Sequence, residues 1–344
     1  MAAVAGRGRA LQLLTTITHS TRSRKTIHSR AISIRSQSVG GTLNKTMETH
    51  YNSHSASSYE SAFFYSEDEY MKFLCERTRD KLGISSSVED NKEETNKNDV
   101  QNAPRRRLLD IGGGTGNFTR MLTKNDSLLD AAIIDPFLSS SIADADDDEE
   151  SDPKMRFVKA GAEEFKSSPD SRGTGDLLPW WRANYDLVLL KEVVHHLPLS
   201  DRVDIFRGIH GLVDDRISSA STTLDDASSS SFLIITRPAR DIDYPLWPAA
   251  LEVWAQNQPS VESLEEDLIA AGFQNVSHTI EVYECETELA RWLDMIQQRF
   301  WSTFSEFTDL ELKEACDQIA RVVVVDEAGK IKFEDRLVFI TACK

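Results

Sequence analysis

Short apolar runs alternate with helical patterns along most of the chain, and this alternation constrains the fold more than any other feature. The apolar, partly β-branched runs cover residues 107–111, 131–135, 155–159, 185–190 and 232–236. Runs of this length suit strands that are buried on both faces. Strands that alternate with helices form a mainly parallel, doubly wound sheet. The sequence therefore predicts an α/β fold.

The last third of the chain departs from strict alternation. Residues 275–285 and 336–343 indicate two further strands, which gives a seven-stranded sheet. Between them lie two segments with helical spacing. We therefore expect a helical lid over residues 286–323, inserted between the last two strands.

Capping signals predict where several helices begin and end. Residues 308–311 and 263–266 each have a hydroxyl followed three positions later by Glu, as in a capping box. Gly272 is expected to end the helix that the second box starts. Ser66 and Glu69 indicate a further helix that precedes the sheet and can close over it.

The N-terminal segment has the composition of a targeting signal. Residues 1–46 contain no acid, and their basic residues stand among Ser and Thr, as in organelle transit peptides. We expect a mitochondrial protein, with the plastid as an alternative, or the cytoplasm if translation starts at Met47. Residues 47–104 should hold the N-terminal capping helix and a linker, and residues 105–344 the α/β domain.

Charge and composition disfavour several classes of partner. The formal net charge of −17 argues against nucleic acid or an anionic membrane as the main partner. Residues 139–154 and 214–231 are polar loop insertions, and the first carries a block of acids without the glycine and closing Glu of a calcium loop. Four cysteines without a C-x-x-C pair indicate reduced thiols. The sequence therefore predicts no metal.

A glycine-rich turn follows the first predicted strand. It begins at Asp110 and contains Gly112, Gly113, Gly114 and Gly116. Glycine suits such a turn because it lets a ligand approach the backbone and tolerates positive φ. The spacing does not match the G-x-G-x-x-G pattern of dinucleotide-binding proteins, because it is D-x-G-x-G-x-G.

This segment resembles motif I of the class I S-adenosylmethionine-dependent methyltransferases, and the order of the later elements resembles the broad type 11 methyltransferase group. The resemblance runs from about Arg107 to Phe273. It implies a Rossmann-like methyltransferase domain over residues 105–344. It also implies S-adenosylmethionine (SAM) as co-substrate and transfer of its methyl group to an acceptor.

The resemblance also implies a set of cofactor-binding positions. The acids are Asp110, facing the ammonium of the methionine end, and Asp135, facing the ribose hydroxyls. The other positions are Gly112, Gly114, Gly116, Phe137, Ala162, Glu163 and Lys191. Two of these assignments have structural alternatives: Asp110 can cap the turn, and Glu163 can simply open a helix.

Acceptor chemistry is less constrained by the sequence. His195 and His196 follow the fourth strand and are candidates for a general base, although one of them can instead pack in the core. Arg237, Arg299 and Trp301 are candidates for acceptor binding. Cations near the site of an acidic chain predict a small, carboxylate-bearing acceptor methylated at O, N or S, with solvated surface charges as the alternative reading. A thioether acceptor needs no base.

Three other functions remain open at this point. The same fold can serve a noncatalytic SAM-binding assembly or scaffold protein. Methylation of protein or RNA is a further alternative, although an RNA substrate predicts a basic face. A nicotinamide-dependent oxidoreductase is disfavoured by the spacing of the glycines.

Overall fold

The structure is a computed structural model of all 344 residues. It describes residues 68–84, 105–124, 126, 129–138, 155–166, 180–182, 184–214 and 231–344. All of these residues belong to one compact unit. The expected transit peptide, Ser66, the linker and the acidic insertion lie outside the described residues, as does all but the two ends of the 214–231 insertion.

Seven strands form one sheet in the order β3-β2-β1-β4-β5-β7-β6, with only β7 antiparallel to its neighbours. The strands are β1 Arg106–Ile111, β2 Leu129–Ile134, β3 Met155–Val158, β4 Leu187–Lys191, β5 Phe232–Thr236, β6 Gln274–Glu288 and β7 Lys330–Cys343. The predicted doubly wound, mainly parallel seven-stranded sheet is confirmed. β6 and β7 are longer than expected.

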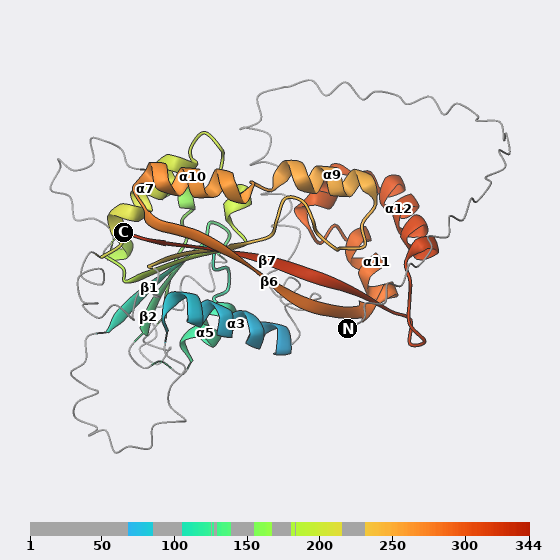
Figure 1. Ribbon diagram of the computed structural model, residues 1–344, viewed down its shortest axis with the longest axis horizontal. Helices are drawn as coiled ribbons and strands as arrows, with labels where there is room; N and C mark the ends of the chain where they lie inside the picture. The colour runs from blue at the N-terminus through green and yellow to red at the C-terminus, as the bar shows by residue number, and fades with distance from the viewer. Residues whose placement is uncertain are drawn as a thin grey trace, which may run out of the picture. The chain divides into compact units, whose positions relative to one another are not determined.

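Helices cover both faces of this sheet. The α-helices are α3 Asp68–Leu82, α5 Asn117–Thr123, α7 Arg202–Leu212, α9 Pro248–Asn257, α10 Val261–Ala271, α11 Leu289–Gln297 and α12 Asp309–Val322. Short 3₁₀ helices are η3 Ala162–Phe165, η4 Trp180–Arg182, η5 Val194–His196 and η6 Ser302–Glu306. α7 and α10 lie on one face, and α3 and α5 lie on the other (Figure 1).

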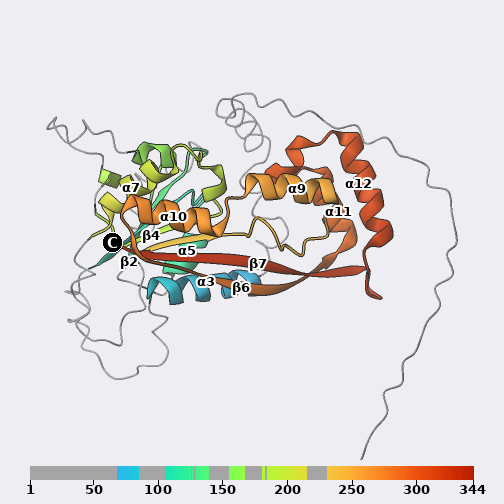
Figure 2. The ribbon, with the colours of Figure 1, turned by 45° about the horizontal axis from the view of Figure 1, so that its top comes forward.

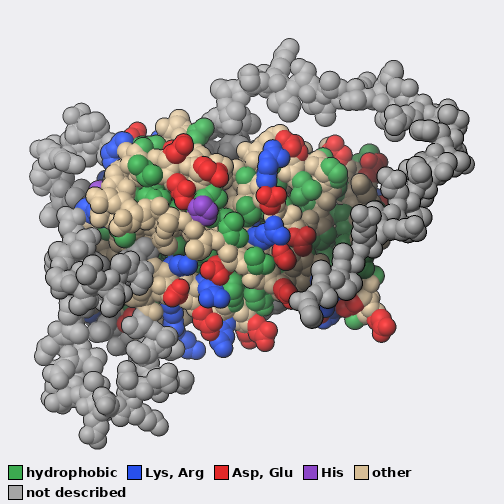
Figure 3. Space-filling model, in the orientation of Figure 1, with side chains coloured by type: hydrophobic (Ala, Val, Ile, Leu, Met, Phe, Trp, Pro, Cys, Tyr) green, Lys and Arg blue, Asp and Glu red, His purple; other side chains and the backbone are tan. Residues whose placement is uncertain are grey.

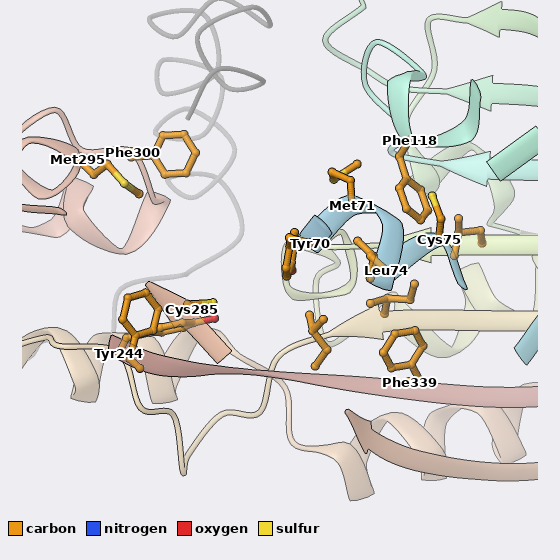
Figure 4. Close-up of a cluster of buried hydrophobic side chains, with 14 of the residues drawn as sticks. Tyr70, Met71, Leu74, Cys75, Phe118, Tyr244, Cys285, Met295, Phe300 and Phe339 are labelled. Carbon is orange, nitrogen blue, oxygen red and sulfur yellow. The ribbon is translucent and has the colours of Figure 1, made fainter. Parts of the chain in front are cut away.

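Alternate strand residues build two separate apolar cores, because side chains of a strand point to opposite faces. Leu109 and Val188 pack toward α7 and α10, whereas Leu108 and Leu189 pack toward α3 and α5. The apolar side chains of α3 lie between Phe118 of α5 and the sheet (Figure 4). The N-terminal helix therefore covers the sheet, as the sequence predicts.

The last two strands extend beyond the parallel strands. β5 pairs only with residues 338–342 of β7, while β6 pairs with β7 from residue 330 onward. α9, α11 and α12 gather beside this extension (Figure 2). In the sequence, the inserted helices thus come between β6 and β7 as predicted. However, β6 continues to Glu288, and the first helix begins only at Leu289.

Two of the predicted helix boundaries are confirmed and one is wrong. Thr308 and Glu311 form the expected capping box of α12, and Gly272 ends α10 with φ 109°. The box predicted at residues 263–266 is wrong, because Ser260 caps α10 and Ser263 donates its backbone N–H to that cap. Both serines precede an apolar stripe, so the pattern alone selects the wrong one.

Two features bear on possible partners. Among the described residues, no helix combines the length and apolar character needed to span a bilayer. The described residues also contain no cluster of at least three His, Cys, Asp or Glu side chains arranged to hold a metal ion.

One close helix contact fixes the position of η3, which carries two of the candidate cofactor residues. Gly208 of α7 lies against the backbone of Phe165. A Cβ added to Gly208 would overlap the carbonyl oxygen of Phe165 and would lie 2.7 Å from the carbonyl carbon of Phe165. Gly211, three residues further along α7, has open space around the same position. Gly208 therefore permits the approach of α7 to η3.

We predict opposite effects for alanine at these two glycines. Gly208→Ala should destabilise the protein by about 1–3 kcal/mol because the helices must separate. Gly211→Ala should stabilise it by about 0.5–1 kcal/mol because alanine has the higher helix propensity. Urea unfolding followed by circular dichroism measures both, and equal effects of the two variants would contradict the close α7–η3 contact.

Candidate functional site

The turn between β1 and α5 is built around glycines with left-handed backbone. Gly112, Gly114 and Gly116 have φ of 75°, 56° and 75°. The Gly112 N–H donates to the Ile134 carbonyl at 2.6 Å, which ties the turn to the end of β2. An added Cβ on Gly114 would meet nothing within 4 Å, so this glycine faces open space. The turn thus leaves room for a ligand against its backbone.

Asp110 is buried near the end of β1, beneath this turn. Its side chain accepts a hydrogen bond from the Thr119 hydroxyl through Oδ2, while no described residue donates a hydrogen bond to the buried Oδ1. Burial raises the pKa of Asp110 to about 6, against the opposing effects of the Thr119 hydrogen bond and Lys191. A buried carboxylate oxygen without a partner is costly, so this atom suits a ligand that brings a positive charge.

Asp135 follows β2 and holds the glycine turn from the other side. Its Oδ2 accepts from the Gly114 N–H at 3.0 Å, and its Oδ1 accepts from the Phe137 N–H at 2.7 Å. Burial raises the pKa of this carboxyl group, and the two backbone hydrogen bonds oppose the shift. Each oxygen keeps a second lone pair, which leaves ribose binding possible beside the structural role.

The residues expected near adenine lie on neighbouring loops. Phe137 is 41% exposed. In η3, Ala162 is buried and Glu163 is exposed, with the Glu163 carboxylate curled over Gly161. Adenine contacts for these three residues stay predictions.

Lys191 closes β4 on the α5 side of the sheet. Its Nζ lies 5.3 Å from the centre of the Phe118 ring. Burial lowers the pKa of the Lys191 ammonium, and the charges of Glu192 and Asp110 oppose this. Lys191 and Asp110 therefore influence one another at the carboxyl ends of β4 and β1.

The two histidines stand in η5, just beyond β4. Their rings lie 3.9 Å apart between centres. The Nδ1 atom of His195 is buried and finds no hydrogen-bond partner in the part of the chain that the structure describes, and burial lowers the pKa of that imidazole. A neutral His195 at physiological pH retains a lone pair that can accept a proton. A base role for either histidine stays a prediction.

Arg237 directly follows β5 and is only 5% exposed. Its Nε donates to Asp335 at 2.9 Å and to the Tyr244 hydroxyl at 2.6 Å, and its Nη2 donates to Asp335 at 3.0 Å. Its Nη1 pairs with Glu192 at 2.5 Å. Burial opposes the charge, but Asp335 and Glu192 outweigh it and raise the pKa of Arg237. The guanidinium is thus bound by two carboxylates of the protein itself.

Arg299 and Trp301 lie in the segment between α11 and α12. Arg299 donates to the Phe307 carbonyl at 2.8 Å and pairs with Asp309 at 2.8 Å. The Trp301 ring is centred 5.0 Å from the Tyr244 ring and stacks on Phe304 at 5.6 Å. Trp301 therefore connects to Arg237 through Tyr244, whereas Arg299 braces its own segment.

The structure brings together several residues that the sequence singled out. It adds several that the sequence analysis did not find. Asp110, Lys191, His195 and Arg237 all follow or close neighbouring parallel strands. The missed members are Glu192, Tyr70, Tyr244, Asp335 and Thr119. Glu192 stands between Lys191 and the histidines in a segment that the sequence had already marked, whereas Asp335 gives no signal beyond being an acid within a strand.

Comparison with known proteins identifies the class. A family model described as a methyltransferase domain matches residues 85–278. This is more than half of the chain, and the chain therefore belongs to this methyltransferase family. It is an S-adenosylmethionine-dependent methyltransferase. No curated protein matches the chain significantly.

Solved structures with a similar fold share little sequence with the chain. A SAM-dependent methyltransferase from Archaeoglobus fulgidus is 16% identical, with a TM-score of 0.38 over 80% of this chain and 94% of the other. The YcgJ protein from Bacillus subtilis is 12% identical, with a TM-score of 0.40 over 72% and 96%. A phosphoethanolamine N-methyltransferase from Haemonchus contortus is 14% identical, with a TM-score of 0.41 over 85% and 60%.

The residues of this site fit the co-substrate that the family implies. The unpartnered Oδ1 of Asp110 suits the ammonium of SAM, and the open side of Gly114 leaves room for its methionine end. When bound, SAM supplies a sulfonium methyl that is already activated for displacement. The chain's own residues need only bind it and align the acceptor.

We predict that Asp110 makes the stability of the ligand-free protein depend on pH. Its folded pKa of about 6 lies above the usual aspartate value of 3.8, so the folded chain binds the proton more tightly than the unfolded chain. The contribution of Asp110 to stability should therefore rise as pH falls from 7.5 toward 4. Asp110→Asn should remove this gain and stabilise the ligand-free protein at pH 7.5 by on the order of 3 kcal/mol.

Urea unfolding at several pH values measures this effect, with the exposed Asp317→Asn as the matched control. The same Asp110 variant should bind S-adenosylhomocysteine more weakly in calorimetry, since its amide no longer offers a negative charge to the ammonium. A wild-type protein whose stability falls between pH 7.5 and pH 5 relative to Asp110→Asn would contradict the assignment.

We also predict that Gly114 limits cofactor binding by the space beside it. Gly114→Ala should weaken S-adenosylhomocysteine binding about tenfold or more, because the added methyl group enters that space. Gly329→Ala is the matched control, since Gly329 also has positive φ and open surroundings but lies in the turn before β7. Both variants should lose about 1–2 kcal/mol of stability from the left-handed backbone. Equal affinities of the two variants would refute the placement of the cofactor.

Proposed function

We propose that this methyltransferase acts on a small molecule that binds against the carboxyl ends of β4 and β5. The observation that carries this is the enclosure of the polar groups beyond those strands. Arg237, Tyr244 and Asp335 are 5%, 4% and 0% exposed. Ligands of open α/β sheets bind at the carboxyl ends of the strands. Groups buried this deeply can be approached by a metabolite more readily than by a polymer.

The surface agrees with a small acceptor. Acidic and basic side chains are interspersed on the face seen in Figure 3, over the described residues of that face. A nucleic acid substrate calls for a basic stripe that tracks its phosphates. The net charge of −17 works against such a partner as well.

The more specific expectation of a carboxylate-bearing acceptor depended on Arg237 and Arg299. Arg237 is engaged by Asp335 and Glu192, and Arg299 by Asp309. A bidentate grip on an acceptor carboxylate would have to displace these partners. The proposal is therefore a small acceptor methylated at O, N or S, without a required negative charge.

A fractionation experiment tests this proposal. The full-length chain is incubated with methyl-labelled SAM and a cell extract, which is then separated into small molecules, protein and nucleic acid. We expect the label in the small-molecule fraction, and we expect Gly114→Ala to reduce it. Label found only in protein or RNA, under conditions where S-adenosylhomocysteine binds, would overturn the proposal.

A further inference from the structure

We propose that Glu192 binds the methyl acceptor and that the acceptor presents an amine nitrogen to it. This rests on the proposed function, because it names the chemical class of the small molecule. The observation behind it is a buried carboxylate oxygen to which no group of the described residues donates a hydrogen bond. Glu192 stands at the end of β4, beside the residues that surround the candidate cofactor site.

The backbone of Glu192 is held in an uncommon conformation. Its φ of 59° is left-handed, which residues with a side chain rarely adopt. Its N–H donates to the Ile235 carbonyl at 2.8 Å, so the turn is fixed to the end of β5. Strained backbone of this kind persists where the surroundings hold it and is concentrated at functional sites. The turn places the Glu192 side chain beside Arg237.

The two oxygens of this carboxylate have different surroundings. Oε2 pairs with Arg237 Nη1 at 2.5 Å. Oε1 is buried and has no hydrogen-bond partner among the described residues, although the side chain as a whole is 21% exposed. A buried acceptor atom left unpaired is costly, and the cost is greater when the group is charged. A ligand that donates a hydrogen bond to Oε1 removes this cost.

Asp335, the other carboxylate of this cluster, has no such need. It accepts from Arg237 Nε and Nη2, from the Tyr70 hydroxyl at 2.9 Å and from the Tyr244 hydroxyl. Its oxygens are therefore saturated by the protein. Of the two acids that bind Arg237, only Glu192 has an oxygen left for a ligand.

Charge favours a donor over an anion at this position. The guanidinium of Arg237 contributes one positive charge, and Glu192 and Asp335 contribute two negative charges, which leaves one negative charge in excess. Nearby, Lys191 and Asp110 offset one another. An acceptor carboxylate placed at Oε1 would be repelled, whereas an amine N–H would be attracted.

Aromatic side chains next to this cluster suit the remainder of the acceptor. The Tyr244 hydroxyl lies 2.6 Å from Arg237 Nε, and the Tyr244 ring is 5.0 Å from that of Trp301. Trp301 is partly exposed and stacks on Phe304. An amine with an aromatic or apolar body would therefore meet a carboxylate at one end and rings at the other.

The transfer step balances without a further reactant. The amine is bound neutral, having lost its extra proton to water, and one of its N–H groups donates to Glu192 Oε1. The nitrogen lone pair forms the N–CH3 bond as the S–CH3 bond of SAM breaks, and the pair from that bond stays on sulfur as a thioether. The product ammonium carries the positive charge away. Arg237 acts as a positioning residue, because it holds Glu192 and touches neither reactant.

Matched acceptors test the proposal without any variant. The full-length chain with labelled SAM is offered aromatic and aliphatic compounds in sets of three that share one carbon skeleton and end in a primary amine, a carboxylate or an alcohol. We expect the amines to be methylated at nitrogen. The carboxylate and the alcohol of each set should react at least tenfold more slowly than the amine. Labelled carboxylates or alcohols with unlabelled amines would overturn the proposal while leaving the small-molecule function intact.

Glu192→Gln then tests the residue. It keeps the size of the side chain and removes its charge, so kcat/KM for the best amine should fall about 10- to 100-fold, while S-adenosylhomocysteine affinity stays unchanged. Glu286→Gln, on an exposed acid of β6 that pairs with Lys330, is the control and should behave as wild type.

Two results would overturn the role of Glu192. One is unchanged amine kinetics in a variant whose S-adenosylhomocysteine affinity is intact, which also shows that the variant is folded. The other is a loss of SAM affinity equal to the loss in kcat/KM, with unchanged amine binding to the protein loaded with S-adenosylhomocysteine. That second pattern would assign Glu192 to the sulfonium. Failure of S-adenosylhomocysteine to bind wild type would instead refute the cofactor site itself.

Discussion

The buried ion pair of Arg237 and Asp335 is the interaction on which the organisation of the site depends. Asp335 is fully buried and Arg237 nearly so. Breaking such a pair leaves one uncompensated charge in the core, at a cost of about 3–5 kcal/mol. The pair joins the end of β5 to β7, and Tyr70, Tyr244 and Glu192 bring α3, the loop before α9 and the end of β4 to the same guanidinium.

The antiparallel direction of β7 makes this pair possible. Thr236 pairs with Val338, and because β7 runs against β5, the residues before Val338 continue past the carboxyl end of β5. Asp335 is thereby carried to Arg237. The same extension supports α11, whose Trp292 ring is centred 5.0 Å from the ring of Phe333 in β7. One strand direction thus positions both the charge cluster and the helical segment beside it.

Much of the fold was predictable because it depends on local patterns. Apolar runs of strand length and stripes of helical spacing determine which faces are buried, and the glycine turn at residues 112–116 needs positive φ. The ends of β6 and β7 were not predictable in this way. They pair with each other over residues 274–288 and 330–343, so the pairing extends strands whose local patterns end earlier. The cap of α10 was misplaced because Ser263 is followed three positions later by Glu266, whereas Ser260, which caps the helix, is followed by Ser263.

The candidate site divides along the same line. The acids that follow β1 and β2 could be found from sequence, because a residue at the end of a parallel strand lies at the ligand edge whatever the rest of the chain does. The partners of Arg237 could not be found, since Asp335 is 98 residues away and Tyr70 is 167 residues away. Sequence showed a cation at the edge of the site and suggested an anionic acceptor, whereas the structure shows that the protein supplies the anions.

By itself the sequence determined the strand and helix order, the glycine turn and the methyltransferase class, because each is encoded in residues that are neighbours along the chain. Only the tertiary structure decided which charges remain available. A charged side chain pairs with whichever groups the fold brings within a few ångströms of it. In a low-dielectric interior, that pairing decides more than the residue type does which charged groups remain available to a ligand. Glu192 and Arg237 are one such case: the cation is satisfied internally, and the acid keeps an oxygen to offer.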